Sequence, residues 1–440
     1  MPVHERVSAR WNESLRPVRM QRVALTAGPD DLREALVRTG LEGCVEIDQA
    51  EAASGGAAQS QRQDPVERYA AVAARRGGAA ALVGWCLAQD VPRLGARLGE
   101  VGAALVPLPR PRGVDPPTLL RDAGPAHRAF SPLVRAYGTV PYADVDPSLL
   151  AGLSYIVMFG LMFGDVGHGA LVVVAALVLR SGRISALAGT RHLWPFVAGA
   201  GAAAMAAGLL YGECFGPSGI VPALWLEPLK QPSRLLGYAI GLGAVLLALA
   251  YGVGTVNRWR EDGARTALYA ASGIAGAGLF LGVALVAVGA LAHCGAVQIA
   301  GAALALLGAV AAAIGLAAEA PGGAAGGFQV GIGLFDLVTR IGSNAVSFAR
   351  IAAFGLTHAA LGAVVWQGTT GLAHHGPGGL AGAVALFAVG NAAAFALEGL
   401  VVAVQAMRLE YYELFSRIFD AEGRPFRPFQ LSARPPEVAP

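Results

Sequence analysis

The sequence is poor in charge. Only 14% of its 440 residues are charged and 55% are hydrophobic, whereas soluble domains carry about 25% charged residues. Lys230 is the only lysine, and a formal net charge of +3 is too small to indicate a nucleic-acid partner. The mean hydropathy is +0.52. These absences give no support to a DNA or RNA binder and favour a protein whose solvent is a lipid bilayer.

Several common functional signals are also missing. The cysteines have neither metal-ligand spacing nor an even disulfide framework, so we expect structural thiols, no metal and no cofactor; they are Cys44, Cys86, Cys214 and Cys294. No GxxxxGK[ST] loop occurs, so the chain itself should not hydrolyse ATP. The first twenty residues lack the apolar core of a secretory signal, and we expect a cytoplasmic N-terminus.

A polar region ends near residue 148. Within it the pattern strand, helix, strand occurs twice, as in a ferredoxin-like α+β fold. The first unit spans Gln21–Thr26, Pro29–Thr39 and Gly43–Asp48, and the second Ala79–Cys86, Val91–Val101 and Ala103–Pro107. Between them, Glu51–Arg62 is rich in Ala, Gly, Ser and Gln and reads as a flexible linker. No sustained heptad repeat occurs between Asp48 and Ala79.

Apolar blocks, most of them long enough to span a bilayer, follow residue 148. Ser148–Arg180 is either one long span or a hairpin of two short helices that turns at Gly164–Gly169. The hairpin puts nine connector and tail arginines on the cytoplasmic side, as the positive-inside rule requires: Arg180, Arg183, Arg191, Arg258, Arg260, Arg265, Arg417, Arg424 and Arg427. Eight crossings follow, roughly 149–163, 166–180, 193–215, 233–256, 266–292, 297–318, 334–366 and 379–411.

Arg350 lies inside the apolar stretch Leu334–Trp366. A guanidinium at such depth costs at least ~2.5 kcal/mol, so it must face water or a partner, which we expect to be an anion. Its segment SFARIAAFGLTHAAL is joined by MFGLMFGDVGHG at 158–169, GLLYGECFG at 208–216 and RLEYYELFSRIFDAEGRPFRPF at 408–429. In this order, the four blocks resemble the membrane stator subunit of V-type and A-type rotary ATPases, called subunit a or subunit I, of the 116 kDa subunit family.

The resemblance implies a mostly α-helical membrane protein with a small cytoplasmic ferredoxin-like domain and about eight transmembrane helices. Residues 1–148 would form the cytoplasmic domain, 149–411 the proton-channel domain and 412–440 a cytoplasmic tail. The implied partners are a proteolipid c-ring, whose carboxylate faces Arg350, other membrane-sector and stalk subunits, and the lipid bilayer. The family's long coiled-coil arms have no counterpart between Asp48 and Ala79. Because the sequence has no dense cluster of oxygen ligands, we expect protons rather than sodium as the transported ion.

Arg350 and Arg408 match the family's two channel arginines, and Gln405 precedes Arg408 by three residues on the same helix face. His358 lies eight residues beyond Arg350 and Glu398 ten before Arg408. Since the two helices run oppositely, both displacements point toward the non-cytoplasmic side, by about 12 and 15 Å.

On the cytoplasmic side, Asp336 lies fourteen residues before Arg350, with Arg340 one turn from it. The polar residues thus form two offset columns that meet at arginine, as two proton half-channels require. Asp165, His168 and Glu213 are secondary candidates for the channel lining.

Structural interpretations stay open for each of these residues. Arg350 can pair with a carboxylate such as Glu398, and Arg408, close to its helix end, can snorkel to the interface. Arg340 can snorkel or pair with Asp336. The alternative for Asp336 is a charge at the start of a helix. His358 can be an ordinary hydrogen-bonded histidine. The glycines around Asp165, His168 and Glu213 also indicate a turn.

Other functional classes fit less well. An uncoupled membrane scaffold of the same fold would explain the missing coiled-coil arms, but not the retained Arg350, Gln405 and Arg408. An intramembrane aspartyl protease built on Phe163–Gly167 lacks an evident second aspartate. A secondary transporter should show broken helices in repeated halves, and no such repeat is visible.

The hairpin makes a prediction about topology. We expect Arg183 and Arg260 to be cytoplasmic and Trp225 non-cytoplasmic, because only the hairpin count places the arginines together. Accessibility labelling of single cysteines introduced at these positions measures it. Labelling of position 183 from outside, with the N-terminal domain inside, would show that the hairpin is wrong.

Overall fold

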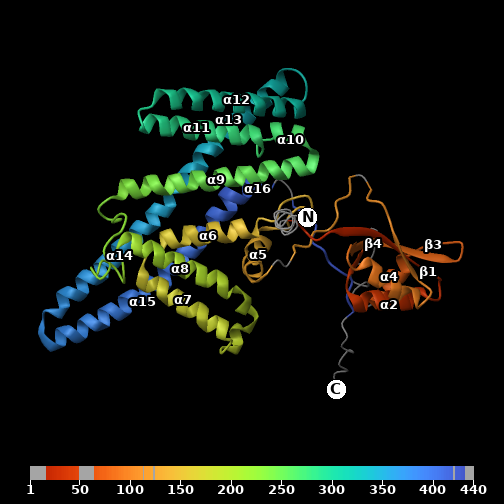
Figure 1. The fold of residues 1–440 in the computed structure, drawn as a ribbon, viewed down its shortest axis with the longest axis horizontal. Helices are drawn as coiled ribbons and strands as arrows, with labels where there is room; N and C mark the ends of the chain where they lie inside the picture. Colours follow the sequence, from red (N-terminus) through yellow and green to blue (C-terminus); the bar gives the residue numbers. More distant parts are fainter. Residues whose placement is uncertain (1–15, 49–63, 112, 122–123, 420–421, 432–440) are drawn as a thin grey trace, which may run out of the picture. The chain divides into compact units, whose positions relative to one another are not determined.

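A computed structural model describes the chain at residues 16–48, 64–111, 113–121, 124–419 and 422–431. The described residues fall into two compact units (Figure 1). The first comprises 1–121, 139–142 and 422–440, and the second 122–138 and 143–421. These units do not follow the expected boundaries at 148 and 412. Residues 122–138 lie in the second unit, and the end of the tail lies in the first. The linker Glu51–Arg62 lies outside the described residues.

The first unit is built around a small antiparallel sheet with strand order β2-β4-β1-β5 and β3 paired to β4. All six elements predicted from the sequence are present. The bounds are β1 Met20–Ala27, α2 Leu32–Glu42, β2 Val45–Ile47, α3 Pro65–Val72, β3 Ala74–Arg76, β4 Ala79–Leu87, α4 Val91–Gly99 and β5 Ala104–Pro107. Helix α2 ends at Gly43, whose φ of 59° is left-handed and whose N–H bonds the Thr39 carbonyl.

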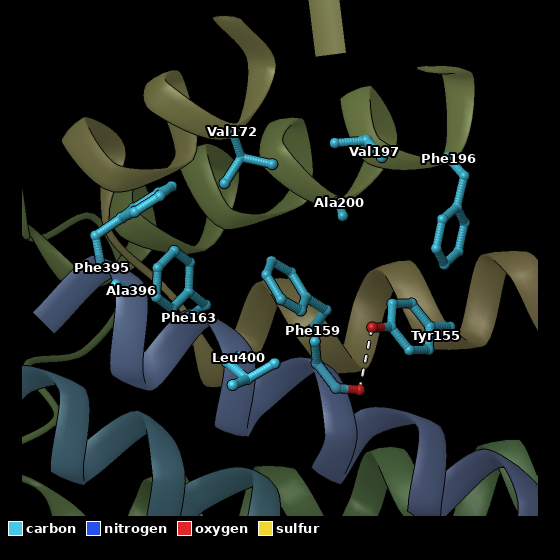
Figure 2. A pocket seen from close by; sticks show the side chains of 12 residues that line it. Tyr155, Phe159, Phe163, Val172, Phe196, Val197, Ala200, Phe395, Ala396 and Leu400 are labelled. Carbon is cyan, nitrogen blue, oxygen red and sulfur yellow. Dashed lines mark hydrogen bonds between the residues drawn. The ribbon is translucent and has the colours of Figure 1, made fainter. Parts of the chain in front are cut away.

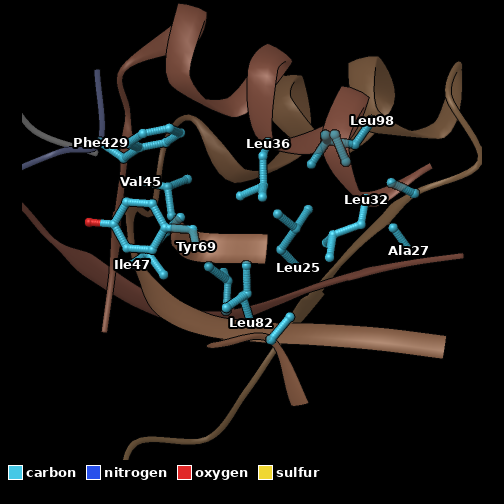
Figure 3. Close-up of a cluster of buried hydrophobic side chains, with 14 of the residues drawn as sticks. Leu25, Ala27, Leu32, Leu36, Val45, Ile47, Tyr69, Leu82, Leu98 and Phe429 are labelled. Carbon is cyan, nitrogen blue, oxygen red and sulfur yellow. The ribbon is translucent and has the colours of Figure 1, made fainter. Parts of the chain in front are cut away.

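The core of this unit is closed by a segment from the far end of the chain. Figure 3 shows Phe429 beside Tyr69 and Val45, within the cluster formed by the strands and α2. The ring centroids of Phe429 and Tyr69 are 5.0 Å apart, edge to face. The Phe429 N–H donates to the Val45 carbonyl at 2.8 Å, and the Leu431 N–H donates to Gly40 at 3.0 Å. Residues 424–431 are thus part of the first unit's fold.

The second unit is helical. Six of its helical segments are long and apolar enough to cross a membrane, and α6 and α7 are shorter apolar helices. The bounds are α5 Pro125–Tyr137, α6 Ser148–Met162, α7 Val166–Ser181, η2 Ser185–Leu193, α8 Trp194–Tyr211, α9 Pro232–Asp262, α10 Ala264–Tyr269, α11 Ile274–Leu291, α12 Gly295–Glu319, α13 Ala324–Ser347, α14 Ala349–Ala373, α15 Gly376–Leu409, η3 Glu410–Phe415 and α16 Ser416–Ile418. The protein is therefore a multi-pass membrane protein.

The apolar block Ser148–Arg180 is two helices, as the hairpin interpretation requires. The break lies between α6 and α7, and α8 packs against both of them (Figure 1). Glycines permit this packing: a Cβ on Gly160 would lie 2.6 Å from the Ala203 Cβ, and one on Gly208 would lie 2.4 Å from the Val166 nitrogen. Small residues let apolar helices approach closely where no water competes for the backbone.

The expected single span 334–366 is wrong in its bounds. The helical run begins ten residues earlier, at Ala324, and is divided at Phe348 into α13 and α14. The Phe348 side chain is fully buried, and a Cβ on Gly243 of α9 would come within 2.2 Å of its ring. The division therefore lies where a large ring packs closely on a neighbouring helix, two residues before Arg350.

The docked C-terminal segment makes a prediction about stability. Phe429→Ala should destabilise the first unit by about 3 kcal/mol, because it removes a buried ring and leaves a cavity beside Tyr69. Hydrogen exchange of the β1 and β4 amides, read by mass spectrometry in the full-length protein, measures the loss. Phe426→Ala is the matched control, since Phe426 is only half-buried and should cost less. Equal protection of β1 and β4 in wild type and Phe429→Ala would contradict the assignment.

Candidate functional site

Helices α14 and α15 pack against each other and carry the principal candidate residues. His358 and Glu398 meet between them. The His358 Nδ1 lies 2.5 Å from the Glu398 Oε2, and the two side chains are 4% and 12% exposed. The structure therefore joins two residues forty positions apart that the sequence placed at similar depth. Glu398 is the partner of His358, so the alternative in which Glu398 pairs with Arg350 is wrong.

The turn between α6 and α7 brings a second group of polar residues to this pair. Asp165 is fully buried and caps α7, because its Oδ1 accepts the His168 N–H at 2.8 Å. Its Oδ2 accepts the Gly216 N–H at 3.0 Å. The His168 and His358 ring centroids are 5.3 Å apart. The turn expected from the glycines is confirmed, and it sets Asp165 and His168 against α14.

Glu213 joins the same turn. Its carbonyl accepts the Val166 N–H at 3.0 Å, and its side chain is 5% exposed. It also lies within electrostatic range of Asp165, His358 and Glu398. The three secondary candidates therefore join His358 and Glu398 in one buried cluster of carboxylates and imidazoles. We call Asp165, His168, Glu213, His358 and Glu398 the histidine–carboxylate cluster.

Aromatic rings surround this cluster. Phe163 lies 4.9 Å from the His358 ring, and Phe395 lies 5.9 Å from the His168 ring, centroid to centroid. Both phenylalanines also line an apolar hollow of about 310 Å³ between α6, α8 and α15 (Figure 2). A second hollow of about 370 Å³, lined by Phe215, Asn391 and Phe395, borders the cluster on the α7 and α15 side. An apolar wall of this kind strengthens every charge interaction within the cluster.

Arg350 lies apart from the cluster, at the start of α14. Its Nη1 is buried and makes no hydrogen bond to any described residue. A hollow of about 450 Å³ adjoins it, lined by Gly342, Ser343, Val346 and Ser347. Arg408 acts on Arg350 electrostatically but is itself exposed, with its guanidinium 5.9 Å from the Tyr412 ring centroid. The Gln405 Oε1 is buried without a hydrogen bond among the described residues.

Asp336 pairs with Arg340, as their four-residue spacing predicts. The Arg340 Nε lies 2.8 Å from the Asp336 Oδ2, and the two side chains are 64% and 54% exposed. Both line a polar hollow of about 640 Å³ between α10, α12 and α13, which Glu319 and Arg417 also line. Asp336 is therefore a half-exposed ion-pair partner and does not contact Arg350.

Three charged residues that follow Arg408 were not predicted from the sequence to be buried near it: Glu410, Glu413 and Arg417. Glu410 and Glu413 lie on the π-helix η3, and all three residues are buried. The Ser154 hydroxyl donates to the Glu410 Oε2 at 2.7 Å. Glu413 lies within electrostatic range of Arg350, Arg408 and Arg417, and close to the Ser347 hydroxyl. π-Helical turns are frequent at functional sites. Two carboxylates three residues apart, directly after an intramembrane arginine, are the signal that could have identified them.

This arrangement defines a multi-pass membrane protein that buries ionisable side chains between its helices. Known proteins with similar sequences are subunits of A-type and V-type ATPases. Residues 81–221 match the sequence model of the V-type ATPase 116kDa subunit family. The A-type ATP synthase subunit I of Thermococcus kodakarensis is 26% identical over 375 residues, which cover 80% of this chain and 54% of that protein. The V-type ATP synthase subunit I 2 of Treponema pallidum is 35% identical over 147 residues, or 30% and 32% of the two chains.

A human relative extends the match to V-type proton ATPases. The V-type proton ATPase 116 kDa subunit a 3 of Homo sapiens is 33% identical over 155 residues, which cover 32% of this chain and 19% of that protein. The family model and these relatives together support the V-type ATPase 116 kDa subunit family for this chain. Three of the curated relatives match most of this chain. The chain spans only about half of the length of each of them.

The double role of Asp165 makes a prediction about stability. Asp165→Ala should cost about 1–2 kcal/mol for the lost helix cap and a further ~1–3 kcal/mol because the buried Gly216 N–H loses its acceptor. Asp165→Asn keeps one acceptor oxygen and should cost less. Thermal unfolding of the purified protein in detergent compares the two. Equal melting of Asp165→Ala and wild type would show that the side chain does not organise the turn.

Proposed function

We propose that this protein is the stator subunit of the membrane sector of a V/A-type rotary ATPase, in which α14 and α15 form two half-channels for protons. The observation that carries the proposal is Arg350. Its buried Nη1 has no hydrogen-bond partner among the described residues, and the Arg350 side chain also lines a hollow of about 450 Å³. A donor of this kind needs an acceptor from elsewhere, and a carboxylate on a rotating proteolipid ring supplies one.

The physical chemistry of a rotary motor requires such an arginine. A ring carboxylic acid can cross lipid only when protonated, because its charged form is too costly there. A guanidinium cannot lose its proton and favours a neighbouring carboxylate, so a proton leaves the ring acid as it reaches Arg350. The same fixed charge repels protons that would pass directly between the half-channels. A lysine at this position would be a poor substitute, since a desolvated ammonium can deprotonate.

The two half-channels are proposed on opposite sides of Arg350. The histidine–carboxylate cluster supports the non-cytoplasmic one, since His358 lies eight residues along α14 from Arg350, or about 12 Å at the usual helical rise. Glu413 and the polar hollow around Asp336 support the cytoplasmic one. Water bridging these groups would complete each path. Arg408 and Gln405 face the arginine junction from α15.

The topology belongs to the same proposal. We infer eight crossings, made by α6, α7 and the six longer segments, with both termini in the cytoplasm of a bacterial or archaeal cell. The strand order of the first unit supports a ferredoxin-like cytoplasmic domain. The proposed partners are the proteolipid ring, other membrane-sector and stalk subunits, and the bilayer, with no nucleic acid. The chain would be a non-catalytic subunit of the complex.

A second candidate is an uncoupled membrane scaffold of the same fold. The absence of a sustained heptad repeat between Asp48 and Ala79 favours it, because such a protein would need no coiled-coil arm. The unpartnered Nη1 of Arg350 argues against it, because a scaffold has no reason to keep a cation with a buried, unsatisfied N–H among apolar helices. Genes for a proteolipid ring and a catalytic head beside this gene would support the motor, and their absence the scaffold.

The proposal predicts that Arg350→Gln abolishes ATP-driven proton transport. Membrane insertion should be unchanged, because neutralising an intramembrane charge eases insertion while it removes the group that drives deprotonation. Proton flux in vesicles reconstituted with the complex, at matched protein level, measures it. Arg183→Gln is the matched control, since Arg183 is exposed in the connector after α7, away from the proposed half-channel residues, and its flux should stay near wild type. Wild-type flux in Arg350→Gln would leave the scaffold as the better account.

A further inference from the structure

Three side chains of the histidine–carboxylate cluster have the arrangement of metal ligands. One ligand atom from each of Asp165, His168 and His358 lies within 4.8 Å of the others, and all three residues are buried. They come from two places in the chain, the start of α7 and the middle of α14. Two imidazoles and a carboxylate are a donor set that divalent zinc commonly takes in sites with an open fourth position.

His168 is the observation that points to a ligand. Its side chain is 2% exposed, and neither ring nitrogen makes a hydrogen bond of good geometry to a described residue, although the Asn391 backbone lies close to the ring. The Asp165 Oδ1 lies 3.7 Å from the Nδ1, beyond hydrogen-bond distance. A buried imidazole without hydrogen bonds costs free energy, since buried polar groups are ordinarily satisfied. A bound cation would satisfy one nitrogen directly.

The other two ligands are already oriented. The His358 Nδ1 is engaged by Glu398 at 2.5 Å, which leaves its Nε2 to coordinate a metal. A carboxylate that holds the far nitrogen of a ligating histidine is the usual outer-shell arrangement at zinc sites. Asp165 is held by two backbone N–H groups and keeps further lone pairs. The donors are therefore fixed before an ion arrives, which reduces the ordering cost of binding.

A hollow lies close to the cluster. It measures about 370 Å³ and is lined by Phe215, Asn391 and Phe395, among others. The rings of Phe215 and Phe395 lie 5.3 and 5.9 Å from the ring of His168, centroid to centroid. Two rings that line the hollow therefore also lie beside His168.

We propose that Asp165, His168 and His358 bind a first-row transition-metal ion, with Zn²⁺ as the best fit. Imidazole donors select zinc, cobalt or copper over Mg²⁺ and Ca²⁺, which prefer all-oxygen sites. The ion would coordinate neutral imidazoles and a carboxylate, without redox chemistry. A consequence that rests on the proposed function is inhibition: an ion bound to His358 would close the non-cytoplasmic half-channel to protons.

Cobalt binding tests the site directly and does not depend on transport. The full-length protein, purified in detergent with a tag that lacks histidine, is titrated with Co²⁺ and followed by visible absorption. One saturable site per chain with a tetrahedral-type spectrum, displaced by Zn²⁺ and not by Mg²⁺, is expected. His168→Ala should weaken binding at least ~100-fold, and Glu398→Gln, which changes only the outer shell, about 10–100-fold.

Controls separate a specific site from surface binding and from unfolding. The double variant His374→Ala/His375→Ala removes two exposed histidines and should bind like wild type. Asp165→Asn keeps one acceptor oxygen for the helix cap but loses the ligand charge, so weaker binding in a variant that still unfolds cooperatively would support the site even if His168→Ala misfolds. Equal Co²⁺ affinity in wild type, His168→Ala and Asp165→Asn would overturn it.

Flux measurements test the inhibitory consequence separately. Zn²⁺ added to the non-cytoplasmic side of reconstituted vesicles should lower proton flux in the wild-type complex. A variant that has lost Co²⁺ binding should be insensitive at the same concentration. Binding without inhibition would confirm the metal site and overturn the blocking role. The flux of Arg350→Gln, measured without added metal, tests the half-channel assignment. Failure of that assignment can therefore be distinguished from failure of the metal site.

Discussion

The cost of a charge in a low-dielectric interior constrains this protein more than any other interaction. Each ionisable group in the apolar helices must find a partner, reach water or receive a ligand. His358 and Glu398 form a hydrogen bond, and Arg340 and Asp336 form an ion pair at the surface. The Glu410 carboxylate accepts a hydrogen bond from the Ser154 hydroxyl. Arg350 and His168 keep buried nitrogens without a hydrogen bond among the described residues. At these two groups we infer function.

The break between α6 and α7 has a structural role that serves the site. Asp165 caps α7 and holds Gly216, so the turn is stabilised by the same side chain that faces His358. Glycines at the helix contacts allow α8 to approach both short helices closely. The residues 81–221, which match the sequence model of the V-type ATPase 116kDa subunit family, include this turn.

Much of the fold could be predicted from local pattern. The two strand–helix–strand units, the interruption near Gly164 and the apolar helical blocks all follow from hydrophobic period, glycine and charge placement. The bounds of α13 and α14 could not, because the division at Phe348 depends on packing against Gly243 of another helix. Glu410, Glu413 and the docking of Phe429 were missed for the same reason: each is defined by a neighbour far away in the chain.

The sequence by itself determined which ionisable residues would cost free energy to bury. An arginine, a histidine and a glutamate inside apolar stretches are visible without coordinates, and helical rise places His358 and Glu398 at comparable depth. Only the tertiary structure decided which of these groups meet. His358 pairs with Glu398, Asp165 and His168 join them across the α6–α7 turn, and Arg350 stays unpaired among the described residues. The physical reason is that depth along a helix follows from residue spacing, whereas the rotation and packing of one helix against another depend on all the side chains between them.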